Sequence, residues 1–301
     1  MKNIFFDSYE RLRNGWWILI FIALMATSRF VYTPVSHALQ QMGVPTDWLD
    51  PLRFGFLLLV TWICVRLRKE RLSSIGFVLD RRWAREIGVG TFFGLASALL
   101  AVAMIWAAGG VHLELDPARS VATLAYGAWV FLFVALFEET LFRGFVFQRL
   151  VAGAGVWIAQ IALGLLFALG HWANPDMHGA TLAWATIDLF LGAVLLGLAY
   201  LRTRSLAMSI GIHLGWNWTL GNLLGFGVSG FGQSGWFHPL LLDRPEWMTG
   251  GRFGPEASIF AVIADLALIL VLWKWKATPR ADAGDVDLPA DPSHIPSRAA
   301  S

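Results

Sequence analysis

The sequence has little charge and almost no cysteine. Only 15% of its 301 residues are charged, against 56% hydrophobic residues, and the mean hydropathy is +0.58. This composition excludes an ordinary soluble globule. The net charge is only +2 and the basic residues gather in no single patch, which excludes nucleic acid as a partner. The single cysteine, Cys64, can form neither an internal disulfide nor a cysteine-based metal site.

Two other sequence features are also missing. The chain contains no repeat of fixed period. The polar segment before Gly15 is followed by an apolar run that has no small-residue cleavage site, so no cleavable signal peptide is evident. We therefore expect the first apolar run to be a retained membrane span.

Long apolar runs are what the chain has instead. A spanning helix needs about 20 mainly apolar residues, and eight runs approach this length: 16–33, 52–65, 87–108, 121–150, 156–172, 182–201, 206–226 and 257–273. The sequence therefore predicts an all-α polytopic membrane protein of about eight transmembrane helices. We expect a helical transmembrane domain over residues 1–276. Residues 277–301, rich in Asp, Pro, Ala and Ser, are expected to form a disordered cytoplasmic tail.

The distribution of lysine and arginine predicts the orientation. With eight spans and a cytoplasmic N-terminus, few of the 23 basic residues fall on the outer side, namely Arg29, Arg53, Arg119, Arg244 and Arg252. Positively charged loops remain in the cytoplasm. We therefore expect both termini in the cytoplasm and the protein in a bacterial-type inner membrane, in contact with lipid.

Charged residues interrupt the fourth apolar run. Glu138, Glu139 and Arg143 lie where a spanning helix should have none, and ionisable groups at that depth are costly enough to suggest a function. Glu139 and Arg143 are four residues apart, so they can pair on one helix face. Glu138 then points about 100° away without a local partner and could act as a general base. Alternatively, the three residues only clamp neighbouring helices together.

Two other runs carry polar pairs at the same spacing of four. The fifth run has Phe167 and His171, with Gly170 expected to let a neighbouring helix approach closely, and the seventh run has His213 and Asn217. Each pair taken alone is equally compatible with a simple hydrogen bond between helices. The pairs become informative only if they meet the charges of the fourth run.

Depth in the membrane decides whether these residues meet. At 1.5 Å per residue from the cytoplasmic helix ends, Glu138, His171 and His213 fall at similar depths. A carboxylate, two imidazoles and the Asn217 amide that converge in a dry cavity can activate water and stabilise an oxyanion. That combination is the chemistry of peptide hydrolysis.

Together the three motifs resemble the CAAX-protease and bacteriocin-processing (Abi/CPBP) family of intramembrane endopeptidases. The pattern of that family is Glu-Glu-x-x-x-Arg, Phe-x-x-x-His and His-x-x-x-Asn/Asp on separate spans. Here the sequence has Glu138-Glu139-x-x-x-Arg143, Phe167-x-x-x-His171 and His213-x-x-x-Asn217 in the same order. The resemblance covers a protease core of about residues 121–224.

The resemblance implies roles for four catalytic residues. Glu138 would activate the water molecule with assistance from His171, while His213 and Asn217 would hold the tetrahedral oxyanion. The substrate would be a protein or peptide that is membrane-associated or lipidated.

The resemblance also implies three supporting residues. Glu139 and Arg143 would form an ion pair, and Phe167 would orient the helix that carries His171.

Two alternatives for a cofactor follow from the resemblance. Glu138, His171 and His213 could bind zinc, or the same residues could work as a metal-free glutamate site. No His-Glu-x-x-His element is present, and catalytic zinc takes three close protein ligands. We expect no tightly bound metal.

Two functions of other classes compete with peptidase activity. A proton- or solute-coupled transporter could use Glu138, His171 and His213 as a relay, and a membrane scaffold or bacteriocin-immunity protein could need them only to hold helices together. Asp188 and Asp265, in the sixth and eighth runs, could contact the site, but we expect them to be hydrogen-bonding groups between helices.

Overall fold

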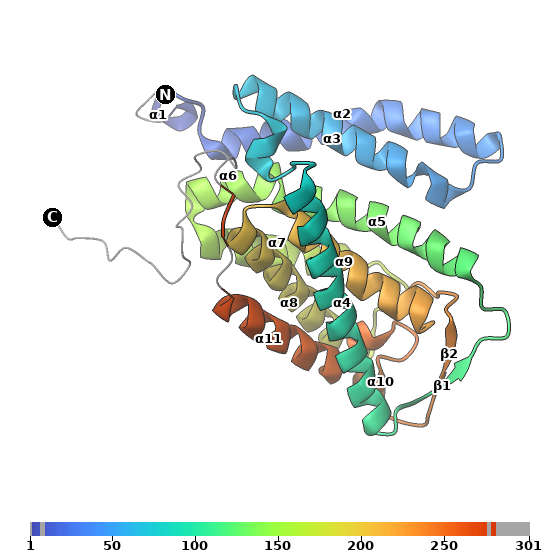
Figure 1. Cartoon of the computed structure of the whole chain (residues 1–301). Coiled ribbons are helices and arrows are strands. Elements are labelled where there is room, and N and C mark those ends of the chain that lie inside the picture. The colour runs from blue at the N-terminus through green and yellow to red at the C-terminus, as the bar shows by residue number, and fades with distance from the viewer. Residues whose placement is uncertain (1, 7–9, 276–277, 281–301) are drawn as a thin grey trace.

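Helices coincide with every apolar run of the sequence (Figure 1). The computed structural model describes residues 2–6, 10–275 and 278–280. In chain order the elements are α1 (Lys2–Phe5), α2 (Asn14–Gln41), η1 (Thr46–Leu49), α3 (Asp50–Leu67), η2 (Leu72–Ile75), α4 (Arg81–Ala107), β1 (Val111–Leu115), α5 (Val121–Arg143), α6 (Phe145–Ala154), α7 (Val156–Gly170), α8 (Gly179–Thr203), α9 (Leu206–Trp218), the π-helical η3 (Thr219–Leu223), β2 (Phe237–Leu241), α10 (Glu246–Thr249), η4 (Pro255–Ala257) and α11 (Ile259–Lys274).

Among the residues that the structure describes, five helical stretches are long and apolar enough to cross a membrane. They are Asn14–Gln41, Thr46–Leu67, Arg81–Ala107, Val121–Ala154 and Gly179–Thr203. The helices of the other three predicted spans are shorter, with 15 residues in α7, 13 in α9 and 16 in α11. The predicted class, a largely helical polytopic membrane protein, is confirmed, whereas the number of eight spans remains a prediction.

The fourth predicted span consists of two helices. The Ser120 hydroxyl accepts a hydrogen bond from the Thr123 backbone and fixes the start of α5. At Gly144 the backbone leaves the helical conformation, with ψ −127°, and a Cβ atom there would lie 2.2 Å from the Thr140 carbonyl oxygen. Only glycine fits so close an approach, so α5 ends directly after Arg143 and α6 continues in a new direction.

Backbone contact joins α4 to α9. A Cβ atom on any of four glycines would lie 2.1–2.5 Å from a carbonyl oxygen of the other helix: Gly90 and Gly94 in α4, Gly211 and Gly215 in α9. Small residues of this kind let membrane helices approach closely. The expectation that Gly170 serves this purpose is wrong, because a Cβ atom there would meet nothing within 4 Å. Its helix face is open rather than packed against a neighbour.

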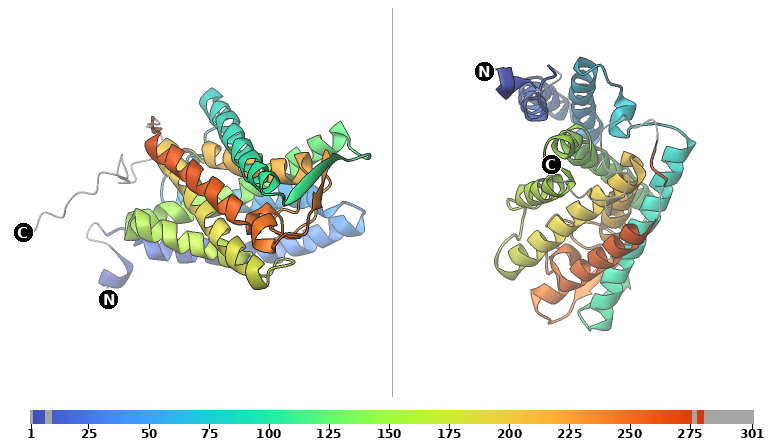
Figure 2. Two further views of the ribbon diagram at one scale, coloured as in Figure 1. Left: turned by 90° about the horizontal axis from the view of Figure 1, so that it is seen from below. Right: turned by 90° about the vertical axis from the view of Figure 1, so that its left-hand side faces the viewer.

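The periphery of the bundle is formed by α2 and α3 (blue in Figures 1 and 2). Only 6% of the most apolar window of α2 is buried inside the protein, and its buried residues are Phe21 and Ser36. The rest of this helix is exposed, as expected for a helix that faces lipid.

A small antiparallel sheet, which the sequence did not predict, lies at the end of the bundle away from the N-terminus (Figure 1). In it β1 pairs with β2, so that Val111 lies opposite Leu241 and Leu113 opposite Pro239. Both strands of a two-stranded sheet are edge strands, which is where proline is tolerated.

Most of the predicted tail, residues 277 and 281–301, lies outside the described residues. Within its described part, the backbone N–H of Arg280 donates to the Thr203 carbonyl oxygen at 3.1 Å, and the Arg280 side chain pairs with Asp80. This part of the chain therefore contacts the end of α8 and the start of α4.

Candidate active site

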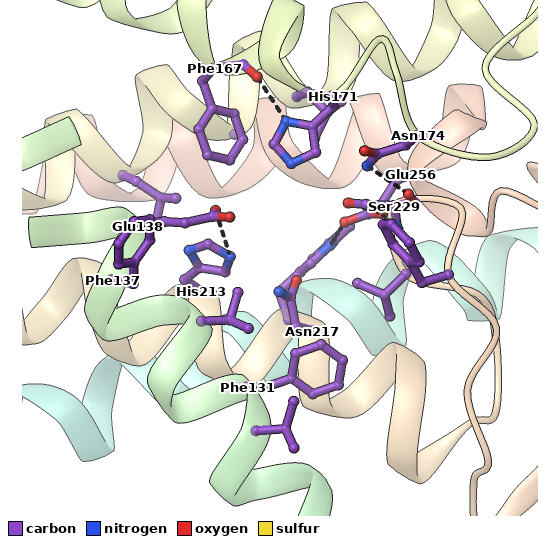
Figure 3. A pocket seen from close by; sticks show the side chains of 18 of the residues that line it. Phe131, Phe137, Glu138, Phe167, His171, Asn174, His213, Asn217, Ser229 and Glu256 are labelled. Atoms are coloured by element: carbon purple, nitrogen blue, oxygen red, sulfur yellow. Dashed lines mark hydrogen bonds and ion pairs between the residues drawn. The ribbon is translucent and has the colours of Figure 1, made fainter. Parts of the chain in front are cut away.

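A cavity of about 720 Å³ lies within the bundle. Its walls come from α3, α4, α5, α7, α8, α9 and α11, together with the segment before α11. Five of the residues singled out by the three motifs line it: Glu138, Phe167, His171, His213 and Asn217 (Figure 3). The structure thus brings three sequence motifs from separate helices to one chamber.

The remaining two motif residues form a buried ion pair beside the chamber. Nη1 of Arg143 lies 3.1 Å from Oε1 of Glu139, and the side chains are only 3% and 0% exposed. Nη2 of Arg143 donates to the Ala193 carbonyl oxygen of α8 at 2.8 Å. The predicted pairing at a spacing of four is therefore present, and it also ties α5 to α8.

His213 contacts both glutamates of the first motif. Its Nδ1 atom lies 2.9 Å from Oε1 of Glu139, and its Nε2 atom lies 3.7 Å from Oε2 of Glu138. An ionised carboxylate can only accept a hydrogen bond. Because Glu139 is the partner of Nδ1, we assign a proton to the Nδ1 atom of His213. The Nε2 atom then faces Glu138.

Glu138 is the glutamate with access to the cavity. Its side chain is 25% exposed, while that of the neighbouring Glu139 is fully buried. The sequence predicts no partner for Glu138 on its own helix, and none is found there among the described residues. The partner that it does have, His213, comes from α9, a relationship that no local spacing could predict.

His171 directly follows the last residue of α7, and Phe167 contacts its side chain in two ways. Its Nδ1 atom lies 2.7 Å from the Phe167 carbonyl oxygen, and the rings of the two residues are 4.7 Å apart between centroids. Phe167 in turn packs edge-on against Phe142 of α5, at 5.2 Å. Phe167 therefore packs against α5 and also contacts the imidazole of His171, while its predicted role in orienting the helix of His171 stays a prediction.

Several cavity residues escaped the sequence analysis because they lie in connecting segments. Asn174 donates to the Ser229 carbonyl oxygen at 2.9 Å, and Glu256 accepts hydrogen bonds from the Ser229 backbone at 2.5 Å and from the Trp216 indole at 3.1 Å. All but Trp216 lie in segments without periodicity. The sequence gives one sign of these residues: Glu256 follows Pro255 directly before the last apolar run, where a charged residue is unusual.

Asp188 and Asp265 do not have the role predicted for them. Both are 4% exposed and line the cavity. Within the described ranges neither carboxylate makes a hydrogen bond to another helix, and Oδ1 of Asp188 is buried without any partner. The interpretation of these residues as helix-to-helix hydrogen-bonding groups is therefore wrong.

The zinc alternative does not fit the arrangement of the side chains. Across the part of the chain that the structure describes, no three His, Cys, Asp or Glu side chains come together in a way that could hold a metal ion. Glu138, His171 and His213 therefore do not form a ligand set, since His171 stands apart from the other two. Nδ1 of each histidine is also engaged, by Phe167 and Glu139 respectively.

Fold and cavity together define a multi-pass membrane protein with a carboxylate and imidazole chamber between its helices. Residues 119–219, which contain all three motifs, match the family described as type II CAAX prenyl endopeptidase, Rce1-like. This match supports the CAAX-protease family that the motifs predict, and it supports peptidase activity at the level of that family. No curated protein and no solved structure matches the chain.

Proposed function

We propose that the chain is an intramembrane endopeptidase in which Glu138 activates a water molecule for attack on a peptide bond. The observation that carries this proposal is the position of Glu138, which is exposed to a cavity that it shares with His171, His213 and Asn217. Its neighbour Glu139 has no such access, because it is fully buried between Arg143 and His213. Of the two adjacent glutamates, only Glu138 can reach water.

His171 suits the role of proton acceptor and donor. The Phe167 carbonyl oxygen can only accept, so the Nδ1 atom of His171 carries a proton and its Nε2 atom keeps a free lone pair. The side chain faces the cavity on the side opposite His213 (Figure 3). It can therefore exchange a proton with a water molecule bound by Glu138.

His213 and Asn217 suit the stabilisation of an oxyanion. For its Nε2 atom to donate a hydrogen bond, His213 must carry both ring protons, and Glu139 at Nδ1 offsets the resulting positive charge. The Asn217 amide lies one helical turn further along α9 and makes no hydrogen bond within the described part of the chain. Two donors aimed into a cavity that excludes bulk water stabilise a developing negative charge efficiently.

The reaction then balances without a cofactor. Glu138 takes one proton from water while the water oxygen bonds to the carbonyl carbon, and His213 and Asn217 hold the resulting oxyanion. When the tetrahedral species collapses, the C–N bond breaks and the proton passes through Glu138 or His171 to the leaving amine. The remaining proton completes the new carboxyl group.

Substrate and location follow from the same interpretation. We propose a membrane-associated protein or peptide, including a lipidated one, as the substrate. We also propose a bacterial-type inner membrane with both termini in the cytoplasm. The start of α2 and the end of α11 lie at the same end of the bundle (Figure 1), which supports an even number of spans. Arg119, Arg244 and Arg252 are at the other end, where few basic residues occur.

The test compares wild type with Glu138→Gln, which keeps the shape and hydrogen bonding of the side chain but removes the base. Membrane proteomes from cells that contain either form should differ in one or more cleaved proteins, and turnover of such a target in proteoliposomes should fall by ~10²–10⁴-fold in the variant. Glu114→Gln, in exposed β1, is the matched control and should leave turnover unchanged.

Three results would contradict the proposal. Retained turnover in Glu138→Gln would refute the assigned base. Proton-dependent solute uptake by proteoliposomes without any cleaved product would favour the transporter. Normal biological function after Glu138→Gln would favour the scaffold.

A further inference from the structure

The cavity is unusually acidic for a chamber inside an apolar bundle. Among its described lining residues, carboxylates greatly outnumber guanidinium groups, since they comprise Asp47, Asp50, Glu138, Asp188, Glu256 and Asp265 against Arg53 alone. The guanidinium carbon of Arg53 also lies 4.1 Å from the centre of the Phe137 ring, which it faces. The interior potential therefore favours a positively charged occupant.

Three of these carboxylates form what we call the acidic subsite: Asp188 of α8, Asp265 of α11 and Glu256 of η4. Each is 4% exposed, and the three lie near enough for their charges to act on one another. No salt bridge joins any of them to a lysine or arginine in the described ranges. Like charges buried together without a counterion are costly.

The carboxylates of the acidic subsite differ in how many hydrogen bonds they accept from the protein. Glu256 accepts three hydrogen bonds, from Trp216 and from the backbone and hydroxyl of Ser229. Oδ1 of Asp188 is buried and has no hydrogen-bond partner among the described residues. A buried acceptor with no donor costs about 1–3 kcal/mol, more when it is charged. Asp188, which lines the cavity, therefore has an acceptor that no donor within the described residues satisfies.

Asp265 lines the cavity next to a residue without a side chain. Gly192 of α8 lines the same cavity, and a Cβ atom on it would lie 3.5 Å from Oδ2 of Asp265, which is an ordinary van der Waals distance. The side chain of Asp265 is therefore not covered by one from Gly192. Glu256 lies on the opposite side of the chamber from Glu138 in Figure 3, with Asn217 between them. A peptide whose scissile bond lay at Glu138 could thus place a nearby side chain at the acidic subsite.

We propose that Asp188, Asp265 and Glu256 bind a lysine or arginine side chain of the substrate peptide. The acidic subsite supplies charge to an ammonium or guanidinium group, while the apolar walls of the chamber accept the methylene stem of such a side chain. This inference rests on the proposed peptidase function, whose specificity it would determine. It implies that the enzyme discriminates between basic and neutral side chains next to the cleaved bond.

A binding experiment tests the acidic subsite independently of catalysis. The probes are butylguanidinium, which mimics an arginine side chain, and its neutral isostere butylurea, titrated into the purified full-length protein in nanodiscs. Wild type and Glu138→Gln should bind butylguanidinium and not butylurea. The isosteric variants Asp188→Asn and Asp265→Asn should bind it at least about tenfold more weakly. Asp243→Asn, an exposed carboxylate outside the cavity, should bind like wild type. Equal binding of both probes, or no effect of either cavity variant, would overturn the proposal.

A cleavage experiment then links the subsite to specificity. Quenched fluorescent peptides anchored in the nanodisc carry lysine, arginine, citrulline or norleucine at one position at a time. Wild type should cleave the lysine and arginine peptides at least about tenfold faster at one position, and Asp188→Asn should lose that preference while still cleaving the norleucine peptide. Cleavage without a basic preference would overturn the inference and leave the peptidase proposal intact. Binding of butylguanidinium with no peptide cleaved would instead contradict the peptidase proposal and leave a cation site.

Discussion

Glu139 and His213 are joined across two helices by a contact of 2.9 Å between a carboxylate oxygen and the Nδ1 atom. This contact gives the two consecutive glutamates of α5 different environments. Glu139 contacts both His213 and Arg143, whereas Glu138 faces the cavity. Two carboxylates with different surroundings can serve different chemical purposes, as acid and base sites in enzymes require.

Replacement of Glu139 by glutamine should therefore impair both folding stability and turnover. The amide can still accept a hydrogen bond from His213, but it cannot offset the charge of Arg143, which stays buried. Removing one partner of a buried pair costs about 3–5 kcal/mol. Thermal unfolding in detergent should show a lower Tm for Glu139→Gln and an unchanged Tm for Glu138→Gln. Equal Tm values for the two variants would contradict the different environments of the two residues.

Arg143→Met should be destabilising for the complementary reason. It removes the guanidinium group that pairs with Glu139 and the side chain that donates to the Ala193 carbonyl oxygen. We expect a loss of about 3–5 kcal/mol, of which the double variant Glu139→Gln/Arg143→Met should recover a part. A double-mutant cycle on the free energy of unfolding measures this coupling.

The control for that cycle is Arg252→Met. Arg252 forms a surface ion pair with Asp176, and its side chain is 89% exposed. Its effect should be below about 1 kcal/mol. Strictly additive effects of the Glu139 and Arg143 substitutions would mean that the two side chains do not interact.

Alanine at Gly94 should separate α4 from α9. Its Cβ atom would lie 2.1 Å from the Ile212 carbonyl oxygen, so α9 must shift and take His213 with it. Overpacking typically costs 1–3 kcal/mol, so we expect a lower Tm together with reduced turnover. Gly88→Ala, on the open face of the same helix, has nothing within 4 Å and should be neutral or slightly stabilising. Similar results at the two positions would argue against backbone contact.

Asp80 should make the stability of α4 dependent on pH. Its carboxylate caps the helix by accepting from the Trp83 backbone N–H at 2.7 Å, and this hydrogen bond, followed by pairing with Arg280, lowers the pKa of Asp80. A lowered pKa in the folded state gives stability that is present above the ordinary aspartate range, about 3.9, and is lost as the pH falls through the folded-state value. The Tm difference between wild type and Asp80→Ala should therefore shrink in acid.

A non-titrating cap provides the comparison for Asp80. Ser120 caps α5 in the same way, with no ionisable group. The Tm difference caused by Ser120→Ala should stay constant over the same pH range, measured by thermal unfolding in detergent. A constant difference for Asp80→Ala as well would contradict its role as a charged cap.

Much of the helical architecture could be predicted from composition and spacing. A membrane leaves no partner for free backbone groups, so a long apolar run must be helical, and each such run proved to contain a helix. The pairing of Glu139 with Arg143 follows from the helical repeat alone. The match at residues 119–219 confirms the family that the three motifs predict.

The contacts between helices could not be predicted in this way. Hydropathy does not report the rotation of a helix about its axis, so it does not reveal that Asp188 lines the cavity or that His213 contacts Glu139. The strands β1 and β2 have only five residues each, and β2 contains a proline, so the sequence pattern is too short to indicate them. Glu256 became part of the chamber through the path of an irregular segment, which sequence periodicity does not describe.

Contact between the backbones of α4 and α9 has a consequence for how a polypeptide enters. Where their glycines meet, these two helices touch backbone to backbone, so the wall that carries His213 and Asn217 has little room to move. The helix α2, which buries only Phe21 and Ser36, is held far more weakly. We expect entry to displace α2 and α3 outward, so that the chamber can widen while the reacting groups keep their spacing.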